Sequence, residues 1–262
     1  MFDLDGYLER IGLQGRPDLR RVHRAHVTTI PFENLDPQRG VPASLELEDL
    51  ERKLVAERRG GYCFEQNLLL KGALEALGAE VDPLLARVRV GVEPGVTRPR
   101  THLILRVRSE GVSWHADVGF GFGCLIEPLP FGPGGAFEQS GWRFRIVEDG
   151  PELVVQSSTG GEFNDIYSFL PQTVPFVDLE TSNWWASTHP RSPFVTGLSV
   201  SLQQDDGKRI SLSDWSELAL TEETPTGTSV TQVARRDVPQ LLSTRFGLDG
   251  FVLGADGHLL RA

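Results

Sequence analysis

The segment Arg59-Gly60-Gly61-Tyr62-Cys63-Phe64-Glu65 leads directly into an apolar pattern that carries Leu70, Leu74 and Leu77. Leucines at positions i, i+4 and i+7 share one face of a helix, so we predict a helix that begins near Tyr62-Cys63 and stops at Gly78. The helix dipole and the unpaired N–H groups of a first turn favour a thiolate over a thiol. Cys63 is therefore a candidate nucleophile, provided that the fold brings a base to it.

Three further helices are predicted ahead of this one, each with apolar residues at helical spacing. They run from Leu4 to Ile11 behind Asp3, from Leu19 to His26 behind Pro17-Asp18, and from Leu47 through Leu54. The last of these is followed by Arg58-Arg59 and then by Gly60-Gly61, which suits a glycine C-cap. The first 80 residues are therefore expected to be helical.

From about residue 84 the apolar period changes from 3.6 to 2, as in Ala86, Val88 and Val90. Further short strand-like runs are separated by turns rich in Gly and Pro: residues 103–107, 114–118, 144–147, 153–155 and 166–170. A small barrel or curled sheet accounts for them. After His189-Pro190 we expect a hairpin that turns at Asp206-Gly207, followed by a final helix that starts at Asp237.

Composition limits the classes of function. The chain has 262 residues and 39% hydrophobic content, enough for one large domain or two to three small ones. Two cysteines are too few for a disulfide framework, or for a zinc cluster without histidine, so we expect reduced thiols and no metal. A net charge of −10 argues against binding to nucleic acid or to an anionic membrane. No targeting segment or membrane span is recognisable, and a cytoplasmic location is expected.

Among the six histidines, His102 is the candidate base. It opens a strand, and a second strand after a short turn ends at Asp117. A turn at Ser109-Glu110 would place the two side chains directly opposite each other, close enough for a hydrogen bond. The other histidines have no such partner in the pattern, and His23 and His26 are expected near the surface of a helix.

Cys63, His102 and Asp117 occur in the order in which activated-thiol enzymes need a nucleophile, a base and an orienting carboxylate. Two alternatives remain open at this point. Cys63 can be a small buried apolar residue, and His102 with Asp117 can be a surface pair on a hairpin. The glycine-rich run from Gly119 to Cys124 is expected to be a tight turn beside the site, with Cys124 a small buried residue.

These segments also resemble the arylamine N-acetyltransferase family. The resemblance covers most of the chain and rests on several separate motifs that occur in the family's order. The motifs are Ile30-Pro-Phe-Glu-Asn-Leu35, Arg59-Gly-Gly-Tyr-Cys-Phe-Glu65, Arg100-Thr-His-Leu103, Ala116-Asp-Val-Gly-Phe-Gly121, Ser182-Asn-Trp-Trp185 and Ser187-Thr-His-Pro-Arg-Ser-Pro-Phe-Val195.

The resemblance implies an α+β fold with a catalytic core like that of cysteine proteases. An N-terminal helical bundle over residues 1–83 would carry the nucleophile. A central β-barrel over residues 84–190 would carry the histidine and the aspartate, and residues 191–262 would form a C-terminal α/β lid.

It also implies the chemistry. Acetyl-coenzyme A would be the donor, an aromatic amine or hydrazine the acceptor, and xenobiotic metabolism the setting. Cys63 would be the nucleophile, His102 the base and acid, and Asp117 the orienting carboxylate. The substrate-binding residues by resemblance are Phe32, Phe120 and Phe194 at the acceptor and Thr101 near the bound cofactor, although each Phe can equally be a core residue.

Other functions share this pattern. An amide synthase of the same fold would take its acyl chain from a carrier protein and close a macrolactam. A thiol hydrolase or a transglutaminase-like enzyme also uses cysteine, histidine and aspartate in this order, and a binding module would use them only as structural residues. The sequence does not separate these by itself, because the size of the acceptor pocket depends on the fold.

Overall fold

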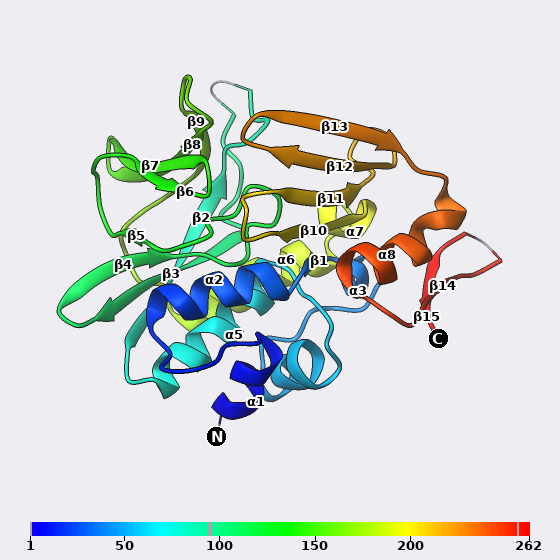
Figure 1. The fold of residues 1–262 in the computed structure, drawn as a ribbon, viewed down its shortest axis with the longest axis horizontal. Helices are drawn as coiled ribbons and strands as arrows, with labels where there is room; N and C mark the ends of the chain where they lie inside the picture. Colours follow the sequence, from blue (N-terminus) through cyan, green and yellow to red (C-terminus); the bar gives the residue numbers. More distant parts are fainter. Residues whose placement is uncertain (1, 94–95, 256) are drawn as a thin grey trace.

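A computed structural model of the chain describes residues 2–93, 96–255 and 257–262. Helical segments fill the N-terminal part: α1 (Leu4–Arg10), α2 (Leu19–Thr29), α3 (Leu35–Gln38), α4 (Leu47–Leu50), the π-helical η1 (Glu51–Ala56) and α5 (Cys63–Ala76). Figure 1 shows α1, α2 and α5 gathered beneath two β-sheets. The described part of the chain has no helix long and apolar enough to cross a bilayer.

The predicted helix starts are confirmed for α1, α2 and α5. Asp3 and Asp18 act as N-caps, since their carboxylates accept hydrogen bonds from Gly6 N at 3.0 Å and from Arg21 N at 2.9 Å. The fourth predicted helix begins at Cys63 and gives way to Gly78, which has φ of 88°. A left-handed backbone at that position suits glycine.

The predicted glycine C-cap of the third helix is wrong. The helix ends in a π-helical turn at Ala56, and Arg58 has the left-handed backbone, with φ of 53°. Gly60 instead allows a close backbone approach, because an added Cβ would lie 2.1 Å from the carbonyl oxygen of Pro31. The two glycines therefore serve the packing beneath α5.

Eight antiparallel strands form the larger sheet: β2 (Glu80–Val88), β3 (His102–Ser109), β4 (Val112–Ala116), β5 (Leu129–Pro130), β6 (Phe137–Gln139), β7 (Trp142–Asp149), β8 (Glu152–Ser158) and β9 (Asn164–Phe169). Their order is β5-β4-β3-β2-β9-β8-β7-β6. The sheet curls around a core that includes Leu84, Phe144 and Val155, all fully buried. The predicted barrel or curled sheet is confirmed.

The C-terminal part contains α6 (Phe176–Thr188), α7 (Pro193–Thr196), β10 (Ser199–Gln203), β11 (Arg209–Ser213), β12 (Ala219–Thr224), β13 (Gly227–Gln232), the 3₁₀ turn η2 (Arg235–Asp237), α8 (Val238–Phe246), β14 (Phe251–Leu253) and β15 (Leu259–Arg261). The predicted hairpin forms between β10 and β11, and the predicted final helix begins at Val238. Helix α6 and strands β12 and β13 were not predicted. The α+β class is confirmed.

A short strand connects the N-terminal helical part with the C-terminal sheet. β1 (Phe32–Glu33) lies among the N-terminal helices in sequence, yet it pairs with β10 at the edge of the five-stranded sheet β1-β10-β11-β12-β13. Leu35, just after it, packs in the same core cluster as Leu198 and Leu212. The division at residues 83 and 190 stays a prediction. The contacts of β1 and Leu35 cross both of these boundaries.

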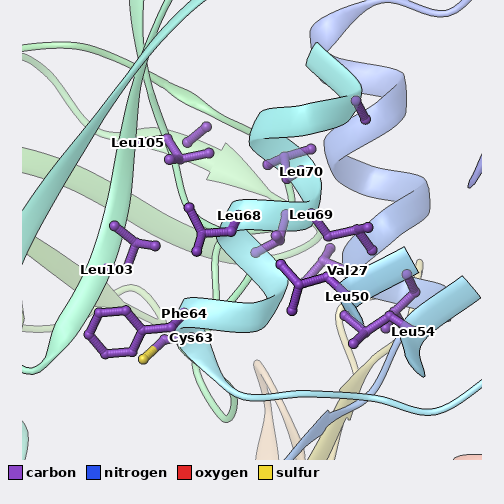
Figure 2. Close-up of a cluster of buried hydrophobic side chains, with 14 of the residues drawn as sticks. Val27, Leu50, Leu54, Cys63, Phe64, Leu68, Leu69, Leu70, Leu103 and Leu105 are labelled. Carbon is purple, nitrogen blue, oxygen red and sulfur yellow. The ribbon is translucent and has the colours of Figure 1, made fainter. Parts of the chain in front are cut away.

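Helix α5 is buried over most of its surface, including Leu69 and Leu70 at 0% exposure. Figure 2 shows leucines of α4 and η1 packed on one side of α5, Leu103 and Leu105 of β3 on another, and Cys63 at its first turn. A helix held on several sides cannot shift without opening the core. This packing fixes the position of Cys63 against the barrel.

Candidate active site

Cys63 is the first residue of α5 and is 2% exposed. Its Sγ lies 3.6 Å from the carbonyl oxygen of Thr101, the residue before β3. The helix start is held by Glu65, whose Oε2 accepts a hydrogen bond of 3.1 Å from the backbone N–H of Tyr62. The sequence pattern thus places the thiol at a helix N-terminus, and the packing places it at the N-terminal end of β3.

His102 and Asp117 lie beside this thiol. His102 Nε2 donates a hydrogen bond of 2.8 Å to Asp117 Oδ2, and both side chains are buried. Burial by itself lowers the pKa of His102, but the Asp117 carboxylate and the neighbouring Cys63 raise it to about 10. The imidazolium form of His102 is therefore stable at neutral pH.

The predicted hairpin register is off by two residues. Leu105 pairs with Ala116 and Ser109 with Val112, so the turn is made by Glu110-Gly111. These two residues have φ of 53° and 77°, the left-handed pair that a two-residue hairpin turn needs. A shift of two residues keeps every side chain on its face, so Asp117 still meets His102, but diagonally and just beyond the end of β4.

The Asp117 carboxylate has a complete set of partners. Oδ1 accepts hydrogen bonds of 2.9 Å from both Asn67 Nδ2 and the backbone N–H of Gly119. Burial opposes the charge, but the His102 imidazolium and these donors hold the pKa of Asp117 well below its usual range. Asn67 comes from α5, one turn after Cys63, so a single helix positions both the thiol and the carboxylate.

His23 is a functional neighbour that sequence reasoning missed. The prediction that His23 and His26 lie near the surface is wrong, since both are fully buried. His23 Nε2 accepts a hydrogen bond of 3.2 Å from the backbone N–H of Asp117, and Nδ1 donates one of 3.0 Å to the carbonyl of Ile126. Burial lowers the pKa of His23 to about 4, so the ring is neutral. The signal available in the sequence was the helical spacing of Val22 and His26, which marks a buried face of α2 next to His23.

Tyr167 of β9 was missed as well. Its ring centroid lies 4.9 Å from that of His102, and its hydroxyl is 2.8 Å from His115 Nε2. Burial and the charge of Asp117 raise the pKa of Tyr167 well above its usual value, which keeps the phenol protonated. The residue forms part of the barrel side of the site.

The aromatic residues named by resemblance fall into two groups. Phe120 packs edge-on against His102, with ring centroids 5.2 Å apart. Phe194 lies 5.9 Å from Phe32 and 5.5 Å from Tyr62, the residue before Cys63. Phe120 thus neighbours the imidazole, whereas Phe194 contacts the residue just before the nucleophile. Phe120 and Phe194 are only partly buried.

The glycine-rich run from Gly119 to Cys124 is the predicted tight turn. A Cβ on Gly119 would lie 2.7 Å from Cys63 Cα, and Gly121 has φ of 80° with the Phe32 ring against it. Cys124 is a small buried residue, as predicted, and its thiol donates to the carbonyl of Asp117 at 3.0 Å. Both cysteines are free.

A half-open cavity of about 1320 Å³ lies between the barrel and the five-stranded sheet. Its wall includes Phe120 from the active-site turn, Trp142 from β7, and Arg209 and Glu223 from the sheet. Residues 2–93, 96–255 and 257–262 contain no group of three or more His, Cys, Asp or Glu side chains placed to hold a metal ion. The cavity reaches the site through Phe120, which packs on His102.

A thiol at a helix N-terminus, beside a histidine held by a carboxylate, defines the class of thiol-dependent acyl-transfer enzymes. A family model described as N-acetyltransferase matches residues 17–250. Arylamine N-acetyltransferase of Mycolicibacterium smegmatis is 42% identical over 215 residues, which cover 79% of this chain and 78% of that protein. The corresponding Mycobacterium bovis protein is 37% identical, with 98% of this chain and 93% of that protein covered.

Solved structures agree with these matches. The arylamine N-acetyltransferase structure from M. tuberculosis has a TM-score of 0.88 at 37% identity and covers 94% of each chain. The Mycobacterium marinum enzyme, solved in complex with CoA, also has a TM-score of 0.88 at 37% identity, with 94% of this chain and 93% of that chain covered. The chain belongs to the arylamine N-acetyltransferase family.

Proposed function

We propose that this protein transfers an acetyl group from acetyl-coenzyme A, through a thioester on Cys63, to the nitrogen of an aromatic amine or arylhydrazine. The observation that carries the proposal is the buried position of Cys63, at the start of α5, beside His102 and Asp117. His102 and Asp117 are joined by a hydrogen bond of 2.8 Å. Family membership and the CoA complex of the M. marinum relative support the donor. A cytoplasmic location is part of the same proposal.

In the first half-reaction the Cys63 thiolate attacks the thioester carbonyl. The bond between the acetyl carbon and the sulfur of coenzyme A breaks, and the His102 imidazolium gives its proton to the departing thiolate. N–H groups in the first turn of α5 are suited to stabilise negative charge on the carbonyl oxygen. The products are free coenzyme A and acetylated Cys63.

In the second half-reaction the amine nitrogen attacks the carbonyl of acetylated Cys63. His102, now neutral, takes the proton from nitrogen, and the Cys63 thiolate leaves, which restores the resting ion pair. Asp117 keeps the ring oriented through both steps. Coenzyme A leaves before the amine reacts with acetylated Cys63, so the kinetics should be ping-pong.

Phe32, Phe120 and Phe194 are proposed to bind the acceptor ring, with Thr101 beside the donor. Phe120 contacts the His102 ring, and Phe194 contacts Phe32 and Tyr62 next to the nucleophile. Aromatic side chains favour offset or edge-on contact with a planar ring. No metal enters any of these steps, so activity should survive chelation with EDTA.

The test mixes purified protein and acetyl-coenzyme A with and without an arylhydrazine or a 4-substituted aniline, and follows release of free coenzyme A. Without the acceptor, wild type should release at most about one coenzyme A per Cys63, and continued release should need the acceptor. Cys63→Ala should reduce the turnover rate by at least about 10³-fold. Cys124→Ala is the matched control, because Cys124 is also a buried free thiol but lies behind Asp117. It should retain most of the activity.

Two outcomes would contradict this proposal. Near wild-type transfer by a Cys63→Ala protein would show that Cys63 is not the nucleophile. No release of coenzyme A, together with rapid alkylation of Cys63 by iodoacetamide, would favour the amide synthase that takes its acyl chain from a carrier protein.

A further inference from the structure

Arg209 stands in the wall of the large cavity without a full set of partners. It opens β11 and is 4% exposed, and the cavity it lines also reaches Phe120, which packs on His102. The guanidinium Cζ lies 3.4 Å from the centroid of the Trp142 ring. The cation thus lies over an aromatic ring, in the wall of a cavity that reaches the active-site turn.

Its polar contacts are few for a buried cation. Nη1 lies 3.5 Å from Glu223 Oε2, at the outer limit of a hydrogen bond. Nε and Nη2 are buried and have no hydrogen-bond partner among the described residues. Burial lowers the pKa of Arg209 to about 10, against the opposing effect of Glu223, so the side chain remains a cation at neutral pH.

The neighbouring strand does not supply the missing acceptor. Gln203 is the cross-strand partner of Arg209, but its Nε2 donates to the carbonyl of Gly121 at 2.9 Å and its Oε1 has no partner. Buried donors without acceptors are costly and rare in folded proteins. A guanidinium kept in this state at a cavity wall is suited to bind a ligand that supplies the acceptor oxygens.

We propose that Arg209 recognises an anionic oxygen group, a carboxylate or a phosphate, on a substrate that occupies the cavity. The ligand replaces the Glu223 carboxylate, which is loosely held and 25% exposed. Because Nε and Nη2 are covered in this structure, the guanidinium turns from the Trp142 ring toward the cavity as the ligand binds. The identity of the ligand as a substrate rests on the proposed function.

Two substrates can bring this chemistry. Coenzyme A carries phosphates, whereas an acceptor amine can carry a carboxylate on its ring. The same guanidinium would serve either, and matched pairs of ligands separate them. Coenzyme A is paired with pantetheine, which lacks the nucleotide phosphates, and 4-aminobenzoate is paired with the neutral 4-methylaniline.

The experiment compares wild type, Arg209→Met and Glu223→Gln. Calorimetric titration gives the Kd of coenzyme A and of pantetheine. Turnover with the neutral donor 4-nitrophenyl acetate gives kcat/KM for 4-aminobenzoate and 4-methylaniline. Methionine keeps an unbranched stem over Trp142 without the charge, and Arg143→Met is the matched control, because Arg143 lies over Phe163 outside the cavity wall.

Arg209→Met removes a charge-assisted bidentate contact, so it should worsen the Kd or the kcat/KM of the anionic member of one pair by about 10- to 100-fold. The same quantity for the neutral member should change by no more than about twofold. An effect confined to coenzyme A assigns the phosphate, and one confined to 4-aminobenzoate assigns the carboxylate. Glu223→Gln should strengthen the binding of the same anionic ligand, because it removes the carboxylate that competes for Arg209.

Equal effects on the anionic and neutral members, or no effect beyond that of Arg143→Met, would overturn the proposal and leave Arg209 a structural residue. Arg209→Lys, which keeps the charge but not the fork, should lie between wild type and Arg209→Met, so the result does not depend on one variant folding. If wild type transfers no acetyl group, the proposed function fails, while the titrations with coenzyme A still test whether Arg209 binds phosphate.

Discussion

At the scale of single residues, the charge state of His102 depends on two neighbours. Burial disfavours the imidazolium, and the Asp117 carboxylate with Cys63 reverses that preference and raises the pKa of His102 to about 10. Asp117 can do this because Asn67 and Gly119 hold it as the carboxylate, while His23 holds its backbone N–H. The ion pair between the His102 imidazolium and the Asp117 carboxylate therefore exists only in the folded state.

This arrangement predicts a pH-dependent stability. The folded pKa of His102 lies above the value of about 6.5 of an unfolded histidine, so the stabilisation is complete below about pH 6.5 and is lost as the pH rises toward 10. Urea unfolding of wild type and His102→Gln at pH 6, 8 and 10 should show a difference in unfolding free energy that narrows with pH. A difference that stays constant would mean that His102 is not charged in the folded protein.

At the scale of elements, the start of α5 rests on a buried ion network. Lys53, brought in by the π-helical turn η1, lies 2.6 Å from Glu65 Oε1 and 2.8 Å from Asp36 Oδ2. Arg59 pairs with Glu33 and with Asp36 in the same network. Since Glu65 also accepts from the N–H of Tyr62, the network holds the backbone just before Cys63.

Removing one charge from this network should be costly. Lys53→Met leaves the buried Glu65 carboxylate without its cation and should lower the unfolding free energy by about 3–5 kcal/mol. Adding Glu65→Gln should recover part of the loss, because the unpaired charge is gone. Urea unfolding of both single variants and the double variant measures this coupling. Purely additive losses would contradict a direct interaction.

At the scale of the whole molecule, the C-terminal sheet takes one of its strands from the N-terminal part of the chain. β1 pairs with β10, and Asn34 next to it donates to the carbonyls of Phe194 and Gly197 at 2.8 and 2.6 Å. Leu35 packs in the core of that sheet. The segment around Phe32, which bridges to Gly61 just ahead of α5, therefore depends on strands from the C-terminal part of the sequence.

We expect wild type to unfold cooperatively in urea and iodoacetamide to alkylate its Cys63 rapidly. A shortened chain that ends at residue 196 should lose both properties, because β1 and Leu35 lose their partners. Tryptophan fluorescence in urea and a labelling time course measure both. Arg261→Ala is the control, because it removes only the exposed ion pair with Glu57 and should cost less than about 1 kcal/mol. A shortened chain with a sharp transition and a reactive thiol would show that residues 1–196 fold alone.

Local patterns in the sequence were sufficient to predict the elements that carry Cys63 and His102. The helix start at Cys63, the strand start at His102 and the glycine at position 78 follow from periodicity and backbone preference over a few residues. The meeting of His102 with Asp117 followed from strand alternation even though the register was off by two, because the side-chain period is 2. The family resemblance added the roles that these residues are proposed to have.

Only the tertiary structure determined what depends on distant contacts. The turn at Glu110-Gly111 set the register, and the packing of α2 against the barrel buried His23 behind Asp117. The pairing of β1 with β10 and the incompletely paired guanidinium of Arg209 over Trp142 arise between segments far apart in the chain. Periodicity reports which face of an element is apolar, whereas the partner of that face is decided when all elements compete for one core.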